Sequence, residues 1–230
     1  MTNYTISITS DTVCPWCYVG LRRLQSAIST HQTTYPTDKF TTTWHPFYLN
    51  PDSPAPGVDK QEVYARKFGA QRTHMMQQHL SRLAQPLGIN FAFGGKTGNT
   101  RDSHRVIALA HESGGTELQN AVVEEFFKAY FEANEDISER EVLVRRAARA
   151  GMKEEDVRTY LESGEGGEEV DREVAAAKSR FVGGVPDFVV NGRYEVQGAE
   201  EPDAFLDIFE RIRKESGGAE GGVVAKGESC

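Results

Sequence analysis

The chain is poor in cysteine and contains no long apolar run. Only three of its 230 residues are cysteines, which is too few for the disulfide framework of a small secreted domain. No stretch reaches the roughly eighteen consecutive apolar residues of a membrane span. The first residues also lack the basic and apolar regions of a secretory signal. We therefore expect a soluble protein of the cytoplasm, with no part in a membrane.

The chain also has fewer basic than acidic residues. There are 26 lysines and arginines against 34 aspartates and glutamates, which gives a net charge of -8. Because neutralisation of phosphates by basic side chains supplies most non-specific affinity for DNA and RNA, this balance disfavours nucleic-acid partners. The length exceeds that of a usual single domain, so either one fold with a large insertion or two modules is expected.

Both ends of the chain carry strand patterns. Residues 4–9 alternate apolar and polar side chains, a helical pattern follows from residue 14, and residues 39–48 alternate again. This order predicts a β-α-β unit with parallel strands. Near the other end, residues 188–190 and 193–196 flank Asn191-Gly192, which favours a β-hairpin with a type I′ turn. A last helix is expected over residues 202–214.

The middle of the chain is helical throughout by its apolar spacing. Helices are expected over residues 61–86, 102–113, 117–133, 138–150, 153–163 and 168–180. Ser138 and Glu141 fit a capping box at the start of one of them. The expected domains are a discontinuous one of residues 1–58 and 181–214 and a helical insertion of residues 59–180. Residues 215–230, rich in glycine, are expected to form a flexible tail.

Two cysteines lie at Cys-x-x-Cys spacing where the first strand is followed by a helix. Thiols at this spacing can close a small disulfide ring, and the first sulfur faces the unpaired N–H groups of the helix start. Those groups and the helix dipole favour the thiolate, so we expect Cys14 to attack and Cys17 to resolve. Pro15 suits the first helical turn, and Trp16 is expected at the surface as a contact for incoming thiols.

The same spacing also occurs in zinc sites. Four-coordinate zinc needs two further ligands, and the third cysteine, Cys230, lies in the glycine-rich tail. The sequence therefore predicts no metal. A proline at the entry of the strand near residue 188 suits a tight turn with a cis Val185–Pro186 bond.

Four segments together resemble the thioredoxin superfamily in its DsbA-like branch, and more narrowly the FrnE-like proteins. They are residues 11–20 (DxxCPWCYVG), 46–51 (PFxLNP), 99–105 (NTxxxHR) and 184–188 (GVPxF). The resemblance covers about residues 4–214. It implies an α/β, thioredoxin-like fold of the order β-α-β … β-β-α with a large all-helical insertion.

The resemblance also implies roles for residues. The first cysteine of the family, here Cys14, attacks; the second, here Cys17, resolves; and the loop of Val185 and Pro186 faces them across a groove. No organic cofactor is implied, with glutathione as a candidate redox partner. His104 is expected either at the border of this groove or as a locally satisfied helix-cap histidine.

Two further features have competing interpretations. His45 on the second strand could point toward the thiol pair and stabilise a thiolate, although a plain strand histidine is the simpler interpretation. The aromatic side chains at helical spacing favour a packed core over a cofactor pocket; they are Phe126, Phe127, Tyr130 and Phe131.

Three functions remain open at the level of the sequence. The leading one is a protein-disulfide oxidoreductase or isomerase acting on a disulfide- or thiol-containing protein or small molecule. The second is a glutathione-dependent transferase or isomerase of the kappa-class or hydroxychromene-carboxylate isomerase type, whose members typically have serine at the first thiol position. The third is a non-catalytic binding module that uses the groove beside Trp16. The two sulfurs favour the first, while the redox direction and oligomeric state stay undetermined.

Overall fold

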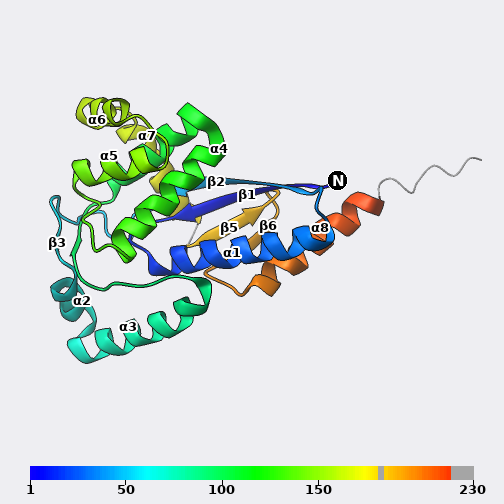
Figure 1. The fold of residues 1–230 in the computed structure, drawn as a ribbon, viewed down its shortest axis with the longest axis horizontal. Helices are drawn as coiled ribbons and strands as arrows, with labels where there is room; N and C mark the ends of the chain where they lie inside the picture. The colour runs from blue at the N-terminus through cyan, green and yellow to red at the C-terminus, as the bar shows by residue number, and fades with distance from the viewer. Residues whose placement is uncertain (181–183, 219–230) are drawn as a thin grey trace, which may run out of the picture.

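A computed structural model describes residues 1–180 and 184–218 of the chain. Its centre is a four-stranded sheet of the order β2-β1-β5-β6 (Figure 1). Strand β1 (Asn3–Ser10) pairs in parallel with β2 (Lys39–Pro46) and antiparallel with β5 (Asp187–Val190), which pairs antiparallel with β6 (Tyr194–Gln197). The predicted thioredoxin-like order of elements, with many helices between the two halves of the sheet, is confirmed.

The sequence pattern explains why β1 lies at the centre of this sheet. Tyr4, Ile6 and Ile8 point into the core while the residues between them are exposed, as the period of two in a strand requires. Tyr4 also stacks on Phe40 of β2, with ring centroids 4.5 Å apart. Burial of these apolar and aromatic side chains fixes the register of the central strand pair.

Helices make up most of the remainder. They are α1 (Pro15–Thr34), α2 (Lys60–Phe68), α3 (Ala70–Ala84), α4 (Arg101–Phe131), α5 (Arg140–Arg149), α6 (Glu154–Ser163), α7 (Gly167–Arg180) and α8 (Pro202–Gly218), with a short 3₁₀ turn at Gln85–Leu87. Helix α1 contacts α8, while α4 and α7 both contact β2. Helices α2 and α3 lie together at the end of the molecule near the start of α1 (Figure 1).

Several boundaries differ from the sequence-based expectation. The helix expected over residues 61–86 is broken at Gly69. The separate helices expected over residues 102–113 and 117–133 are confirmed, because the backbone of α4 is non-helical at Gly114 and Gly115, where two helices meet at a kink. A two-stranded sheet of β3 (Val58–Asp59) and β4 (Lys96–Thr97) was not expected in the helical segment. Strands this short carry too few residues to show an alternating pattern.

The predicted capping box is wrong. Helix α5 starts after Glu139, and the Ser138 hydroxyl donates to Asp136 at 2.6 Å instead of capping the helix. Asp136 gathers several local donors and so competes for the serine.

The last helix also ends later than expected. It continues to Gly218 instead of ending at residue 214, and the Glu215 carboxylate accepts from Tyr194 and Arg193. The rest of the expected tail, including Cys230, lies outside the described residues, and the division into domains stays a prediction.

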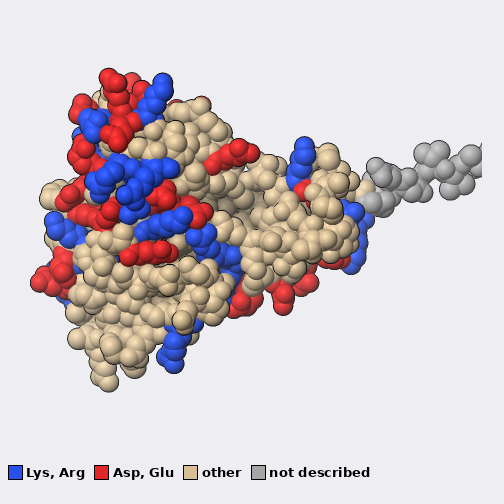
Figure 2. Space-filling view, viewed as in Figure 1, with Lys and Arg blue, Asp and Glu red and all other residues tan. Residues whose placement is uncertain are grey.

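The surface is unevenly charged. Figure 2 shows basic and acidic side chains gathered over α5 and α6, whereas the visible surface over α2 and α3 is largely neutral. None of the helices among the described residues combines the length and apolar character that crossing a membrane requires.

Candidate active site

The two thiols sit at the start of α1, as predicted. Cys14 is the N-cap residue with an extended backbone, and Pro15 occupies the first helical turn. The N–H of Cys17 donates to the Cys14 carbonyl at 3.1 Å, which winds the chain into helix directly after the first sulfur. Both cysteines are free thiols. Cys14 therefore lies directly before the first helical turn, at the N-terminal end of α1.

The loop before β5 closes the other side of the thiol pair. The Cys14 thiol donates to the Val185 carbonyl, with sulfur and oxygen 3.5 Å apart. The Val185–Pro186 bond is cis, as is the unexpected Ala55–Pro56 bond. Gly20 of α1 lies under this loop: a Cβ there would come within 2.9 Å of Phe188 Cζ and 3.1 Å of Pro186 Cγ. A residue without a side chain is needed for α1 to approach β5 this closely.

Cys17 has a different environment from Cys14. It is 1% exposed, and burial raises the pKa of its thiol well above the usual value; the neighbouring Cys14 sulfur raises it further, and Ser10 and the Asp11 backbone oppose the shift. A high pKa keeps Cys17 protonated until its partner sulfur has reacted. The pair thus consists of Cys14 at the N-terminal end of α1 and Cys17, a buried thiol with a raised pKa.

A cavity of about 410 Å³ opens beside Cys14. Trp16, 39% exposed, stands on its wall together with Val185, so these predicted groove residues do meet. The opposite wall comes from the helical segment of the chain. Its residues are mainly apolar and aromatic, among them Tyr64, Met76, Leu80, Phe91, Tyr130 and Phe131. A cavity of this size suits a small molecule or a short side-chain segment.

His104 does not reach this cavity. Its Nε2 lies 3.1 Å from the Phe47 carbonyl oxygen, to which an Nε2–H donates, and 3.4 Å from Asp11 Oδ1, which is ion-pair distance without a hydrogen bond. Asp11 is fully buried, accepts from the Leu49 N–H at 2.8 Å, and its carbonyl accepts from the Cys14 N–H at 3.0 Å. His104 therefore supports the turn that leads into the first cysteine.

His45 is also separated from the thiols. Its Nδ1 lies 3.2 Å from Glu173 Oε2 on α7. Together with His104 it lines a second cavity of about 190 Å³ beside β2. The structure thus gives both histidines positions outside the expected groove. The four predicted core aromatics of α4 are buried, as expected, and Tyr130 and Phe131 also line the cavity beside Cys14.

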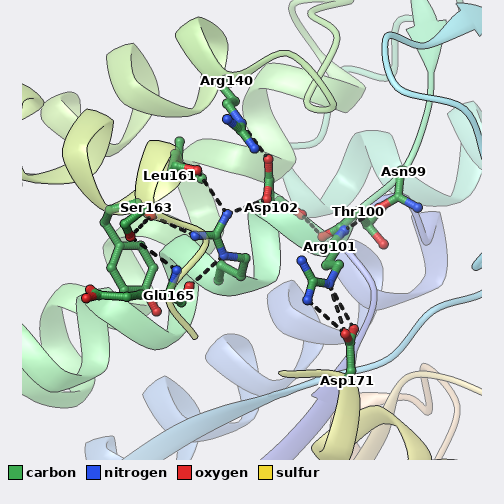
Figure 3. A network of polar contacts seen from close by, with 12 residues as sticks. Asn99, Thr100, Arg101, Asp102, Arg140, Leu161, Ser163, Glu165 and Asp171 are labelled. Carbon is green, nitrogen blue, oxygen red and sulfur yellow. Dashed lines mark hydrogen bonds and ion pairs between the residues drawn. The ribbon is translucent and has the colours of Figure 1, made fainter. Parts of the chain in front are cut away.

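A polar network fixes the start of α4 and thereby His104 (Figure 3). Arg101 forms a bidentate ion pair with Asp171 of α7, with nitrogen–oxygen distances of 2.9 to 3.0 Å. Arg105, fully buried, donates to the carbonyls of Glu165, Tyr160 and Leu161 and to the Asp102 carboxylate. The segment of residues 99–105 is accordingly a structural junction between the helical segment and the approach to Cys14.

Sequence reasoning missed two residues of the site. Lys60, the first residue of α2, lines the cavity of Cys14 and is only 2% exposed. Asp11 begins the segment of residues 11–20 given above, and the sequence assigns it no role. Neither carries a local signal, because the contacts that give them a position come from α4 and from the segment after β2.

Comparison with solved structures gives similarity over nearly the whole chain. A protein described as a "probable DsbA oxidoreductase" from Streptomyces coelicolor is 26% identical, with a TM-score of 0.81, and 92% of this chain and 91% of that chain are covered. A 2-hydroxychromene-2-carboxylate isomerase is 18% identical, with a TM-score of 0.69 and coverage of 94% and 98%. The cytosolic disulfide reductase DsbM of Pseudomonas aeruginosa, solved with GSH, is 19% identical, with a TM-score of 0.61 and coverage of 91% and 99%.

The sequence itself matches the family described as the DSBA-like thioredoxin domain, over residues 5–210. This span includes both thiols, most of β1, the other strands of the central sheet and helices α1 to α7. Members of the family are thiol-disulfide oxidoreductases in the main, although the isomerase above shows that the fold also serves other chemistry. The chain belongs to the DSBA-like thioredoxin domain family.

Proposed function

We propose that this protein catalyses thiol-disulfide exchange, with Cys14 as the attacking and Cys17 as the resolving residue. The observation that supports this most is the unequal placement of the two sulfurs. Both cysteines are buried, with 3% and 1% exposure, but Cys14 lines the cavity and precedes the first helical turn, whereas Cys17 lies one turn further along and does not line it. A substrate in the cavity therefore meets the Cys14 sulfur first.

The exchange runs on sulfur chemistry alone. The Cys14 thiolate attacks a substrate disulfide R–S–S–R′, forming Cys14–S–S–R and releasing R′S⁻. The Cys17 thiol then loses its proton and attacks the Cys14 sulfur, which releases RS⁻ and leaves the Cys14–Cys17 disulfide. Two electrons pass from the protein thiols to the substrate. The reverse sequence oxidises a substrate dithiol.

The substrate class and setting belong to the same proposal. We expect a disulfide- or thiol-bearing protein or small molecule, no metal or organic cofactor, and glutathione as a redox partner in the cytoplasm. The cytosolic disulfide reductase DsbM, solved with GSH, supports the last two points. The narrower FrnE-like assignment rests on the four sequence segments given above.

The test is a pair of substitutions combined with redox equilibration. In glutathione buffers of graded potential, the wild-type chain should form the Cys14–Cys17 disulfide reversibly, as read by acid quench, alkylation and peptide mass spectrometry. Cys17→Ser should accumulate a mixed disulfide on Cys14, and Cys14→Ser should form none. If both thiols stay unmodified across all buffers, the protein is a binding module and the proposal is wrong.

A second candidate is a glutathione-dependent isomerase or transferase. The similarity in fold to the hydroxychromene-carboxylate isomerase and the small, largely apolar cavity both favour it. Such an enzyme would hold glutathione as a ligand or stable adduct without closing the Cys14–Cys17 disulfide. A wild-type chain that stops at a Cys14–glutathione adduct in the same experiment would identify this function.

A further inference from the structure

The cavity beside Cys14 contains a buried ammonium group. Lys60 is 2% exposed. Its Nζ donates to the Tyr130 carbonyl at 3.0 Å and lies 3.7 Å from the centroid of the Tyr130 ring. Lysine is among the residues least often buried, because its charge is costly to remove from water unless it is paired. A lysine in this position needs a reason.

No carboxylate of the described residues forms an ion pair with this ammonium. Asp136 acts on it through charge at longer range. The oxygens of Asp136 are already engaged, since Oδ2 accepts from the Gly57 N–H at 3.0 Å and Oδ1 accepts from the N–H and hydroxyl of Ser138. The ammonium has three N–H groups that can donate hydrogen bonds, and one of them donates to the Tyr130 carbonyl. The site therefore has a cation with unused hydrogen-bonding capacity.

The reactive sulfur and the ammonium share one cavity. Cys14 and Val185 line one side, and Lys60, Tyr64 and Tyr130 line the other. The charge of Cys14 reaches that wall, because it adds to the effect of burial in raising the pKa of Tyr64. Around Lys60 the lining is apolar and aromatic, with Phe91, Phe131 and Leu80 among its members. In such surroundings an attraction between opposite charges is stronger than in water.

We propose that Lys60 binds a carboxylate of a small disulfide or thiol substrate while its sulfur reacts at Cys14. The site then selects anionic compounds over neutral ones of the same shape. This inference rests on the proposed function and adds its substrate class. The ligand chemistry is a carboxylate attached close to sulfur, whether it belongs to a free small molecule or to the end of a peptide.

A matched pair of substrates tests the proposal. 3,3′-Dithiodipropionic acid and its diamide have the same chain and differ in charge. We compare their second-order rate constants with reduced wild-type protein, Lys60→Met and Lys39→Met, using acid quench and mass spectrometry. Lys39 is exposed and does not line the cavity, so it controls for the loss of one positive charge. In Lys60→Met the rate constant for the acid should fall about tenfold, and that for the diamide should stay within about twofold.

Each other outcome overturns the proposal. If both rate constants fall together in Lys60→Met, the lysine acts on the sulfur or on the fold. If neither changes, or if Lys39→Met shows the same loss, the cavity has no carboxylate site at Lys60. Failure of the proposed function looks different, because then neither compound reacts with any variant.

Two additional measurements separate folding and ligand source. Circular dichroism checks the fold of Lys60→Met; if this variant is unfolded, Lys60→Gln replaces it. Inhibition of wild-type exchange by propionate, compared with a short peptide ending in a free carboxylate and the same peptide amidated, distinguishes a free small molecule from a peptide end. If none of the three inhibits even at high concentration, the carboxylate site is refuted without any substitution.

Discussion

Cys14 and Cys17 are three residues apart at the start of one helix, and their positions there give them different chemistry. Cys14 precedes the first turn, so its sulfur meets the Val185 carbonyl and the cavity. Cys17 is inside the helix and buried, and burial raises the pKa of its thiol. The difference arises from position alone, because the side chains are identical. It assigns the order of attack and resolution in the proposed exchange.

The charge of Lys60 should give the substrate preference a pH dependence. Burial lowers the pKa of Lys60 to about 8, with Asp136 opposing the shift. As pH rises from 7 to 9 the ammonium loses its proton, so the rate ratio of acid to diamide should fall. The other titratable groups that line the cavity are Lys67, Tyr64, Tyr130 and Cys14. Both tyrosines have raised pKa values and stay neutral in this range.

The measurement is the ratio of the two rate constants in buffers between pH 6.5 and about 9.5. Deprotonation of Cys14 affects both compounds equally and cancels in the ratio. In Lys60→Met the ratio should be independent of pH. A wild-type ratio that is equally flat would contradict the role of the ammonium.

At the scale of elements, the contact between α1 and β5 depends on Gly20. Alanine would favour the helix by about 1 kcal/mol. Its Cβ, however, would press on the buried Phe188 ring and on Pro186, and overpacking of this kind costs about 1–3 kcal/mol. We expect Gly20→Ala to lower the free energy of unfolding by about 1 kcal/mol and to slow exchange, because Pro186 adjoins the carbonyl that meets Cys14.

Urea unfolding and the exchange rate measure these two effects. Ser26→Ala, on the exposed side of the same helix, is the control, and its stability should change by less than about 0.5 kcal/mol. A Gly20→Ala protein as stable and as fast as wild type would show that the loop before β5 yields to α1 without consequence.

Elements with a strong local pattern could be predicted from the sequence. The alternation of Tyr4, Ile6 and Ile8 gives β1, and the Asn191-Gly192 turn forms as expected, since both residues have positive φ. The interruption of α4 at Gly114 and Gly115 also follows from the sequence, because two adjacent glycines usually end a helix. The strands β3 and β4 could not be predicted, because they form by the pairing of segments about forty residues apart.

The same division holds for the candidate site. Cys14 and Cys17 carry their chemistry in their spacing and in the helix that follows, so the sequence predicts them. His104 is close in space to the approach to Cys14, but its contacts with Phe47 and Asp11 direct it away from the cavity. Lys60 is polar and begins a helix, which predicts exposure, and only the packing of α4 over it shows that it is buried.

At the scale of the whole molecule, the active cavity is assembled from two distant parts of the chain. The sulfur side comes from the start of α1 and the loop before β5, and the opposite side comes from α2, α3 and α4. The helical segment therefore supplies the surface that selects a substrate, while the sheet and α1 supply the reacting group. Anything that shifts one part against the other changes the fit around a substrate.

Arg105 is one of the groups that hold the helical segment together. It is buried and donates to three carbonyls at the α6–α7 connection and to Asp102 (Figure 3). Arg105→Met should lower the free energy of unfolding by about 3 kcal/mol or more, because it leaves buried carbonyls and a carboxylate without their donor. Urea unfolding measures this loss, and hydrogen exchange should quicken at the α6–α7 connection.

Arg140→Met is a matched control, since Arg140 pairs with the same Asp102 at 2.9 Å from an exposed position. Its loss should cost less than about 1 kcal/mol. Equal destabilisation by the two substitutions would mean that Asp102, and not the buried carbonyls, gives Arg105 its importance.

The position of β1 between β2 and β5 has a consequence for the newly made chain. Cys14 is synthesised before β5, which completes the central pairing and follows about 170 residues later. At about 5–20 residues per second, the ribosome needs roughly 10 to 35 s to make that interval. During that time both thiols are present without the strand, the loop and the helices that later enclose them. Every copy of the protein therefore passes through a stage in which both sulfurs lack the enclosure of the folded protein, and the contact of the Cys14 thiol with the Val185 carbonyl can form only after residue 185 has been made.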